Sequence, residues 1–295
     1  LGVYREAREV VNEGVLWAGA ARLLLYVGAL LAVGRASVAF LDHEWKAGAR
    51  SVHDARAPRL LAWGGSVALL GAPLLLLVLQ LGALEMTAAD VPTLLTDTGW
   101  GHGWSQLMGA CVLAGVALLL PVGRTTSLLL LMASLGVAAA MGGLGHAASD
   151  EQWPLGARLL DAMHVAAMGA WIGGLVVTLL ITRVPAFALR DAAWRTFSRT
   201  ATIMAPVTVL TGVGSGARLL LGTPPAAILA SDYGRLLLGK SVLVLIVLAI
   251  GARQRKRIAR GETAAVGAVR VECAVAAAVL LITAVLTGSE PPAAD

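Results

Sequence analysis

The sequence is poor in charge. Only 14% of its 295 residues are Asp, Glu, Lys or Arg, whereas soluble domains carry about 25%. Hydrophobic residues make up 58% of the chain and gather in long runs that the few charges separate. A soluble domain is therefore excluded as the main architecture, and lipid is the expected solvent of most of the chain.

Cysteine is almost absent. Cys111 and Cys273 each lie inside an apolar run, without a CxxC or Cys/His spacing, so we expect small buried hydrophobes and no disulfide framework or thiolate metal site. The chain also lacks a Walker motif and a phosphorylated-aspartate motif, which excludes an ATP-driven pump and favours a protein that is not an enzyme. No cleavable signal peptide is visible and the first residue is Leu1, which leaves open that N-terminal sequence is missing.

The apolar runs predict an all-α, polytopic membrane bundle that forms a single integral membrane domain. Each run is long enough to cross the hydrocarbon core, and no strand-like alternation competes with them. We expect about eight transmembrane helices, at residues 15–40, 60–84, 104–121, 126–146, 157–182, 199–221, 235–252 and 268–288.

The net charge of +5 is distributed asymmetrically. The segments 41–59, 183–199 and 253–267 and the turn at Arg124 are basic, whereas 85–103, 147–156 and 222–234 contain no Lys or Arg. The positive-inside rule then places the basic segments in the cytoplasm and both termini outside. The basic residues are therefore topology signals, and we expect lipid and no nucleic acid as a partner.

Two short matches suggest an internal repeat. Ala21–Leu24 resembles Ala157–Leu160, and Thr96–Gly99 resembles Ser231–Gly234, at nearly equal offsets. These matches indicate either a parallel duplication into halves 14–146 and 157–288, as in some transporters, or chance, because both are short.

The fifth predicted helix carries ionisable residues, which are costly in lipid and usually functional. Its polar and soft side chains are spaced three, four and three residues apart and share one helical face: Asp161, His164, Met168 and Trp171. We expect this face to point into the bundle.

Further candidate ligands lie near the outer ends of neighbouring helices: Met141 and His146 on the fourth, and His102 on the third. Histidine with methionine suits copper better than magnesium or calcium. Asp161 would orient His164 or balance the charge of the ion, and Lys240, Arg22 and Trp171 would complete the surroundings. Alternatively, these residues form a structural polar network, with Asp161 paired to His164, Lys240 or Arg22, or they bind haem.

Three stretches of the second half of the chain form a recognisable combination. The first is Gly145–Ala147 with Asp161, His164, Trp171, Gly173 and Gly174. The second is Phe197–Arg199 with Pro206 and Thr211–Gly212, and the third is Tyr233–Lys240 with Thr283–Gly288. Together they resemble the bacterial copper resistance protein D (CopD) family of inner-membrane proteins. The first half resembles the family more loosely, through Arg22, Tyr26, Gly34 and the eight-helix count.

The resemblance implies copper movement across the bacterial inner membrane, inward from the periplasm, in copper homeostasis or resistance. It also implies a periplasmic copper-binding partner of the CopC type, and it puts His146, Asp161 and His164 on the copper path. The oxidation state, Cu(I) or Cu(II), stays open. Two rivals remain: a membrane redox protein that binds haem b through His146 and His164, and a copper-delivery factor for oxidase assembly.

Overall fold

The fold is a bundle of long helices. The computed structural model describes residues 2–41, 56–121, 123–142, 153–184, 190–289 and 292, with side chains of the first helix described over residues 16–39. Within this part of the chain there is no strand, and eight helical segments are long and apolar enough to cross a membrane. The predicted all-α bundle with eight spans is confirmed.

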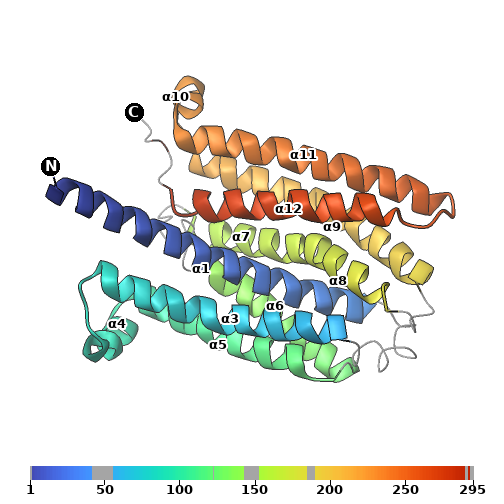
Figure 1. Cartoon of the computed structure of the whole chain (residues 1–295), viewed down its shortest axis with the longest axis horizontal. Helices are drawn as coiled ribbons and strands as arrows, with labels where there is room; N and C mark the ends of the chain where they lie inside the picture. Colours follow the sequence, from blue (N-terminus) through green and yellow to red (C-terminus); the bar gives the residue numbers. More distant parts are fainter. Residues whose placement is uncertain are drawn as a thin grey trace.

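The elements follow one another as a series of spans, and short helices precede two of them (Figure 1). The first four spans are α1 (Gly2–Leu41), α3 (Arg56–Ala83), α5 (Gly99–Leu119) and α6 (Arg124–Met141), with η1 (Ala88–Asp90) and α4 (Val91–Asp97) before α5. The fifth span runs through α7 (Pro154–Met168), η3 (Gly169–Gly173) and α8 (Gly174–Ile181). The last three are α9 (Arg190–Leu219), α11 (Asp232–Ala259) and α12 (Val266–Leu286), with α10 (Pro225–Ala230) before α11.

Several helices extend beyond the predicted spans, and α1, α9 and α11 extend furthest. α1 begins at Gly2, thirteen residues before its predicted start. α9 begins at Arg190, nine residues before its predicted start, and α11 ends at Ala259, seven residues after its predicted end. Both extensions belong to segments that the hydropathy pattern assigned to basic loops. Lys256 and Arg257 occupy the last turn of α11, where cations interact favourably with the helix dipole. Helical hydrogen bonding therefore continues past the point where the apolar run ends.

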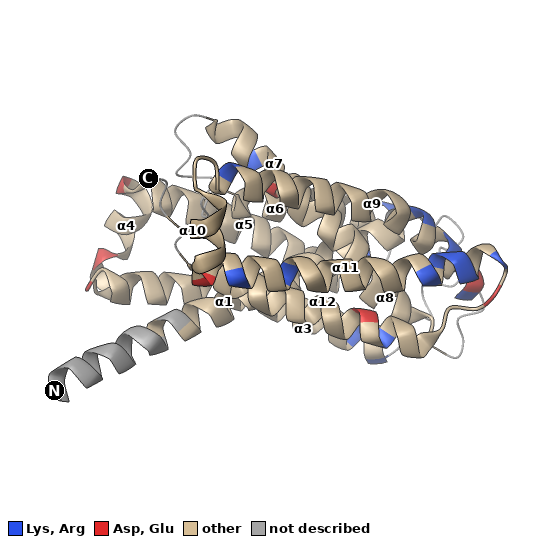
Figure 2. Ribbon diagram, turned by 90° about the horizontal axis from the view of Figure 1, so that it is seen from above, with Lys and Arg blue, Asp and Glu red and all other residues tan. Residues whose placement is uncertain are grey.

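Charge is segregated along the bundle (Figure 2). The basic ends of α9 and α11 lie at one end, whereas α4, α10, the start of α1 and the end of α12 lie at the other (Figures 1 and 2). We call these the basic end and the outer end. The outer end is not free of cations, since Arg158, Arg218 and Arg235 lie in its helix turns. The orientation in the membrane stays a prediction.

Thiol labelling tests this orientation. In a background with both cysteines replaced by Ala, we expect Leu229→Cys on α10 to react with a membrane-impermeant maleimide added to spheroplasts, and Arg260→Cys to react only after lysis. Both side chains are exposed, at 60% for Leu229 and 72% for Arg260. The reverse pattern, read by mass spectrometry of the labelled protein, would place the basic end outside.

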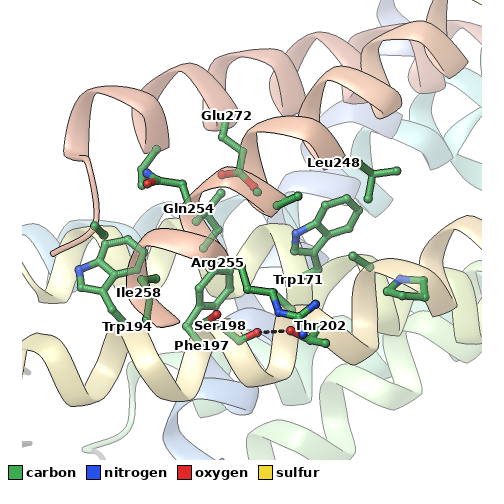
Figure 3. A pocket seen from close by; sticks show the side chains of 18 residues that line it. Trp171, Trp194, Phe197, Ser198, Thr202, Leu248, Gln254, Arg255, Ile258 and Glu272 are labelled. Atoms are coloured by element: carbon green, nitrogen blue, oxygen red, sulfur yellow. Dashed lines mark hydrogen bonds between the residues drawn. The ribbon is translucent and has the colours of Figure 1, made fainter. Parts of the chain in front are cut away.

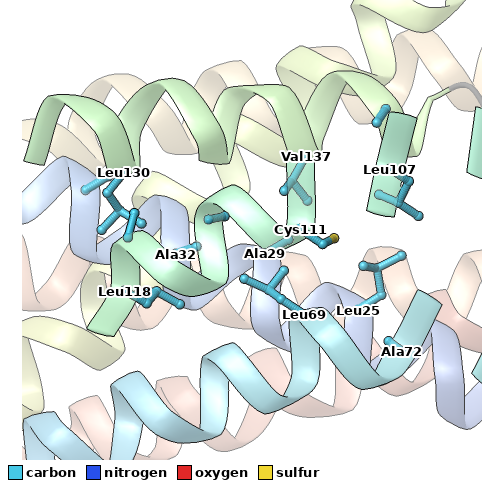
Figure 4. Close-up of a cluster of buried hydrophobic side chains, with 14 residues drawn as sticks. Leu25, Ala29, Ala32, Leu69, Ala72, Leu107, Cys111, Leu118, Leu130 and Val137 are labelled. Atoms are coloured by element: carbon cyan, nitrogen blue, oxygen red, sulfur yellow. The ribbon is translucent and has the colours of Figure 1, made fainter. Parts of the chain in front are cut away.

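The first four spans share one apolar core (Figure 4). Leu69 of α3, Leu107 and Leu118 of α5 and Val137 of α6 are fully buried around Ala29 and Ala32 of α1. α1 packs against α3 and α6 and also against η3, α8 and α12 of the second half. The first helix therefore joins the two halves of the bundle.

Arg35 links α1 to the end of α5. Its guanidinium donates to the carbonyl of Leu118, and Nη2 donates to the carbonyl of Leu120 at 3.2 Å. The last carbonyls of a helix lack intrahelical partners, so one half-buried cation satisfies them. This contact accounts for an arginine in the apolar second half of α1.

α1 and the fifth span meet backbone to backbone. A Cβ atom on Gly173 would overlap the carbonyl of Leu30, and one on Gly34 would overlap the backbone of Gly173 and Gly174. Gly173 ends η3, a π-helical turn inside the span, and such turns often lie near functional sites. Glycine at these positions permits the close approach of the two helices.

The two short outer helices precede similar helix starts. Thr98 caps α5 by accepting from the N–H of Gly101 at 2.9 Å, and Ser231 caps α11 by accepting from the N–H of Gly234 at 3.0 Å. In each case the glycine lies against a carbonyl of the preceding short helix, Leu94 of α4 or Ile228 of α10. In this comparison Thr98 corresponds to Ser231, whereas the sequence match aligned Thr96 with Ser231. The duplication stays a prediction, because a shared need for an N-cap also explains this match.

Candidate functional site

The polar face of α7 points at α9. Asp161 and His164 hydrogen-bond to side chains and backbone of α9. Met168 and Trp171 continue the same face and pack in an apolar cluster that contains Ala205 of α9. The prediction that this face is turned into the bundle is confirmed.

Asp161 is bonded to a hydroxyl group. Its Oδ1 accepts from Ser215 Oγ at 2.7 Å. Among the described residues Asp161 has no ion pair, either with Lys240 or with Arg22. The ion pairs found there join exposed residues: Arg235 with Asp232, and Arg257 and Arg260 with Glu262. The expected charge pairing of Asp161 is therefore replaced by a neutral donor.

His164 is held through one ring nitrogen. Nδ1 lies 3.0 Å from the carbonyl oxygen of Thr208 and 3.1 Å from Thr211 Oγ1. Because a carbonyl oxygen can only accept, Nδ1 carries the proton. Thr211 directs its own hydroxyl proton to the carbonyl of Val207 at 2.7 Å, so its oxygen accepts as well. In the neutral imidazole, Nε2 then keeps its lone pair and makes no hydrogen bond within the described part of the chain.

A glycine makes room for the imidazole. A Cβ atom on Gly212 would lie 2.9 Å from Cε1 and 3.3 Å from Nδ1 of His164. One turn further along α9, a Cβ atom on Gly216 would meet nothing within 4 Å. The His164 ring can therefore occupy this position because residue 212 has no side chain.

Charged groups surround this contact. Lys240 of α11 and Asp161 are close enough for their charges to act on His164, and Asp161 and Arg22 act in the same way on Tyr26 of α1. Lys240, Arg22 and Tyr26 are half-buried. The outer half of the bundle thus contains a polar cluster, built on Asp161 and His164, to which α1, α7, α9 and α11 contribute.

The end of α12 closes the cluster against α1. Tyr26 Oη donates to Thr287 Oγ1 at 3.1 Å, and Arg22 Nη1 lies against Gly288, where a Cβ atom would overlap it. Arg22, Tyr26, Thr287 and Gly288 all belong to the stretches that carried the family resemblance. Residues that are far apart in the sequence are therefore packing partners here.

The remaining predicted ligands are not all brought together. His102 is exposed at the start of α5, which packs mainly against α3, α4 and α6. Met141 packs against the core of the first four spans, whereas Met168 belongs to the α9–α11–α12 side. His146 lies outside the described residues. Within the described part of the chain, no three residues among His, Cys, Asp and Glu form a metal-binding group.

Sequence reasoning missed the partners on α9. Thr208, Thr211 and Ser215 are spaced three and four residues apart, so they form a hydroxyl stripe on one face of α9. This spacing of hydroxyl residues was the signal in the sequence that could have identified α9 as the partner of the polar face of α7. Thr208 and Thr211 are buried, which is unusual for hydroxyl residues without a polar partner.

The comparisons with known proteins agree with the resemblance. A family model described as Copper resistance protein D matches residues 191–286. Copper resistance protein D of Pseudomonas syringae pv. tomato is 31% identical over 175 residues, 55% of this chain and 55% of its own length. Inner membrane protein YebZ of Escherichia coli (strain K12) is 28% identical over 222 residues, 71% of this chain and 75% of its own length.

The chain therefore spans about half the length of the Pseudomonas protein. No solved structure matches it. The family model covers α9, α11 and α12, with Thr208, Thr211, Ser215 and Lys240, whereas Asp161 and His164 precede it. These matches confirm the resemblance seen in the sequence: the chain is related to the copper resistance protein D family.

Proposed function

We propose that this chain moves copper across the bacterial inner membrane, inward from the periplasm, and so contributes to copper homeostasis or resistance. The observation that carries the proposal is the state of His164. Its Nδ1–H is bonded to a backbone carbonyl and its Nε2 makes no hydrogen bond to a described residue, the arrangement of most metal-binding histidines. Relationship to a family named for copper resistance favours copper as the ion.

His164 Nε2 is the proposed ligand in the outer half of the bundle, with Met168 one turn deeper on the same face. A nitrogen and a thioether form a soft-to-intermediate ligand set, which suits copper. His146, Met141 and His102 are further candidates on the approach from the outer end. Two neutral ligands bind less tightly than a closed cysteine site, and release is what transport requires.

Charge balance is the proposed role of the neighbouring residues. A carboxylate near a bound cation lowers the cost of placing that cation in a low-dielectric interior. Asp161 supplies this charge, and Lys240 and Arg22 balance Asp161 when no ion is present. A periplasmic CopC-type protein is the proposed donor, and its docking at the outer end requires the orientation given above.

Transport is tested in proteoliposomes that enclose a copper-sensitive dye. The purified chain should give copper entry well above that of protein-free vesicles, with ascorbate present to supply Cu(I) and omitted to supply Cu(II). Vesicles with the outer end facing out should respond more than inverted vesicles. Entry equal to that of protein-free vesicles under both conditions would contradict the proposal.

Gly212→Ala tests the geometry of the ligand. The added methyl group would displace the His164 ring, so copper affinity should fall by about tenfold, the scale seen when a supporting contact of a ligand is lost. Competition of the detergent-purified protein with a coloured copper chelator measures it. Gly216→Ala is the matched control on the same helix, and we expect it to bind copper like the wild type. Equal affinity of both variants would show that the ring position does not matter.

A further inference from the structure

The second half of the bundle contains a cavity of about 180 Å³ that the proposed copper path does not use. It lies between α9, α11, α12 and the fifth span, toward the basic end. Figure 3 shows its walls, which include Trp171, Trp194, Phe197, Arg255 and Glu272. Most of the lining is apolar, so the charged groups stand out.

Glu272 is a carboxylic acid buried in this apolar setting. It lies on α12, six residues or about 9 Å from the start of the helix, and the residue is 2% exposed. Its Oε1 is 3.1 Å from the place where a Cβ atom on Gly251 of α11 would lie, so the carboxyl group is lodged between the two helices. Within the described part of the chain it makes no hydrogen bond and no ion pair.

An unpaired carboxylate in such a place is strongly disfavoured, because its surroundings are apolar and no cation among the described residues pairs with it. Arg255 lines the same cavity but forms no ion pair with Glu272 among the described contacts. Three other polar groups line the cavity: Ser198, Thr202 and Gln254. Thr202 Oγ1 donates to the carbonyl of Ser198 at 2.8 Å. The Gln254 amide donates to the carbonyl of Ala265 at 2.9 Å and accepts from the N–H of Ala265 at 3.3 Å. Burial therefore favours the neutral acid.

The residues that line the cavity indicate which ligand the Glu272 carboxyl group can bind. Among the described residues that line the cavity there is no His, Cys or Met, so a soft metal ion has no ligands there. Calcium needs six to eight oxygen ligands, and the cavity offers a single carboxyl group. A proton needs neither.

We propose that Glu272 is a proton-binding site, which exchanges its proton with water at the basic end through the cavity. The carboxylic acid releases a proton to water at the mouth, leaving a carboxylate, and takes one up in the reverse step. Three other titratable groups lie nearby: Arg255 on α11, which lines the same cavity, the neighbouring Cys273, and Arg183 beyond α8, whose charge acts on Cys273. Buried carboxyl groups of this kind serve proton relays in pumps and transporters. The site goes beyond the proposed copper movement and does not depend on it.

Dicyclohexylcarbodiimide tests the site directly. This apolar reagent adds to a protonated carboxylic acid, and in a dry environment the adduct rearranges to a stable N-acylurea that mass spectrometry locates on a peptide. We expect the full chain in membranes to be labelled at Glu272 at acidic pH, with labelling lost as the pH rises. Glu272→Asp should retain labelling and Glu272→Gln should abolish it. Glu262, exposed and paired with Arg257 at 3.0 Å, is the internal control and should stay unlabelled.

Vesicle orientation tests the route of the proton. The pH on the face that carries the basic end should set the extent of labelling, in right-side-out and inverted vesicles alike. Glu272 that stays unlabelled at every pH in the folded protein would overturn the proposal. So would labelling that does not change with pH, or labelling that follows the pH on the opposite face.

Discussion

A single methyl group at position 173 is expected to prevent assembly of the bundle. In Gly173→Ala the new Cβ atom would overlap the backbone carbonyl of Leu30 and approach Gly34 Cα to 3.3 Å. Backbone atoms in the middle of α1 cannot move aside as a side chain can, so α1 and the fifth span must separate. We expect near-complete loss of monodisperse protein after detergent extraction, measured by size-exclusion chromatography.

Glycines in open positions provide the control. A Cβ atom on Gly71 of α3 or on Gly239 of α11 would meet nothing within 4 Å. Alanine is favoured over glycine in a helix by roughly 0.5–1 kcal/mol, so Gly71→Ala and Gly239→Ala should raise the thermal stability slightly. Gly173→Ala that elutes and unfolds like the wild type would show that α1 and the fifth span are not in backbone contact.

The second large effect concerns His164. In cells that express His164→Ala, we expect copper accumulation through the chain to fall by at least about tenfold, because loss of a ligand costs no less than loss of its supporting contact. The imidazole is half-buried and packs at the space left by Gly212, so its removal should leave membrane insertion intact. Elemental analysis of washed cells, normalised to the amount of protein in the membrane, measures the effect.

His102→Ala is the matched control for this variant. His102 is exposed on α5, away from the contact of α7 with α9, so we expect a smaller loss. A His164→Ala variant that inserts normally and accumulates copper like the wild type would remove His164 from the path. A larger loss in His102→Ala would move the entry site to the mouth of α5.

The eight spans could be predicted because a helix must be long and apolar to cross the lipid, and the apolar runs of the sequence have the required length. Each apolar run forms a helix, even where it contains a proline, Pro73 in α3 and Pro206 in α9. Hydropathy could not predict where a helix continues beyond its apolar run. The first turns of α9, with Arg190 and Arg195, and the last turns of α11, with Lys256, are helical although they lie outside the apolar runs. The two short helices α4 and α10 were missed for the same reason.

Only the α7 side of the candidate site could be predicted from the sequence. Spacing along one helix places Asp161 and His164 on a common face, but it does not give the register of α7 against α9. That register brings Ser215 to Asp161 and Thr208 to His164. Lys240 was expected at a depth similar to that of Asp161, but depth alone does not predict contact, and no ion pair joins Lys240 or Arg22 to Asp161 among the described residues. Glu272 was overlooked because a single carboxylate in an apolar helix has no pattern around it; its cavity exists only after the helices are packed.

Joint measurement of the metal content and the visible spectrum of the purified chain tests most directly whether His164 binds copper. The protein in detergent, supplied with copper and then desalted, should retain close to one copper per chain and show no Soret band, and His164→Ala should lose most of this copper. A wild-type chain without copper, or a His164→Ala variant that retains as much as the wild type, would contradict the copper site. A Soret band that disappears in His164→Ala would assign the same imidazole to haem.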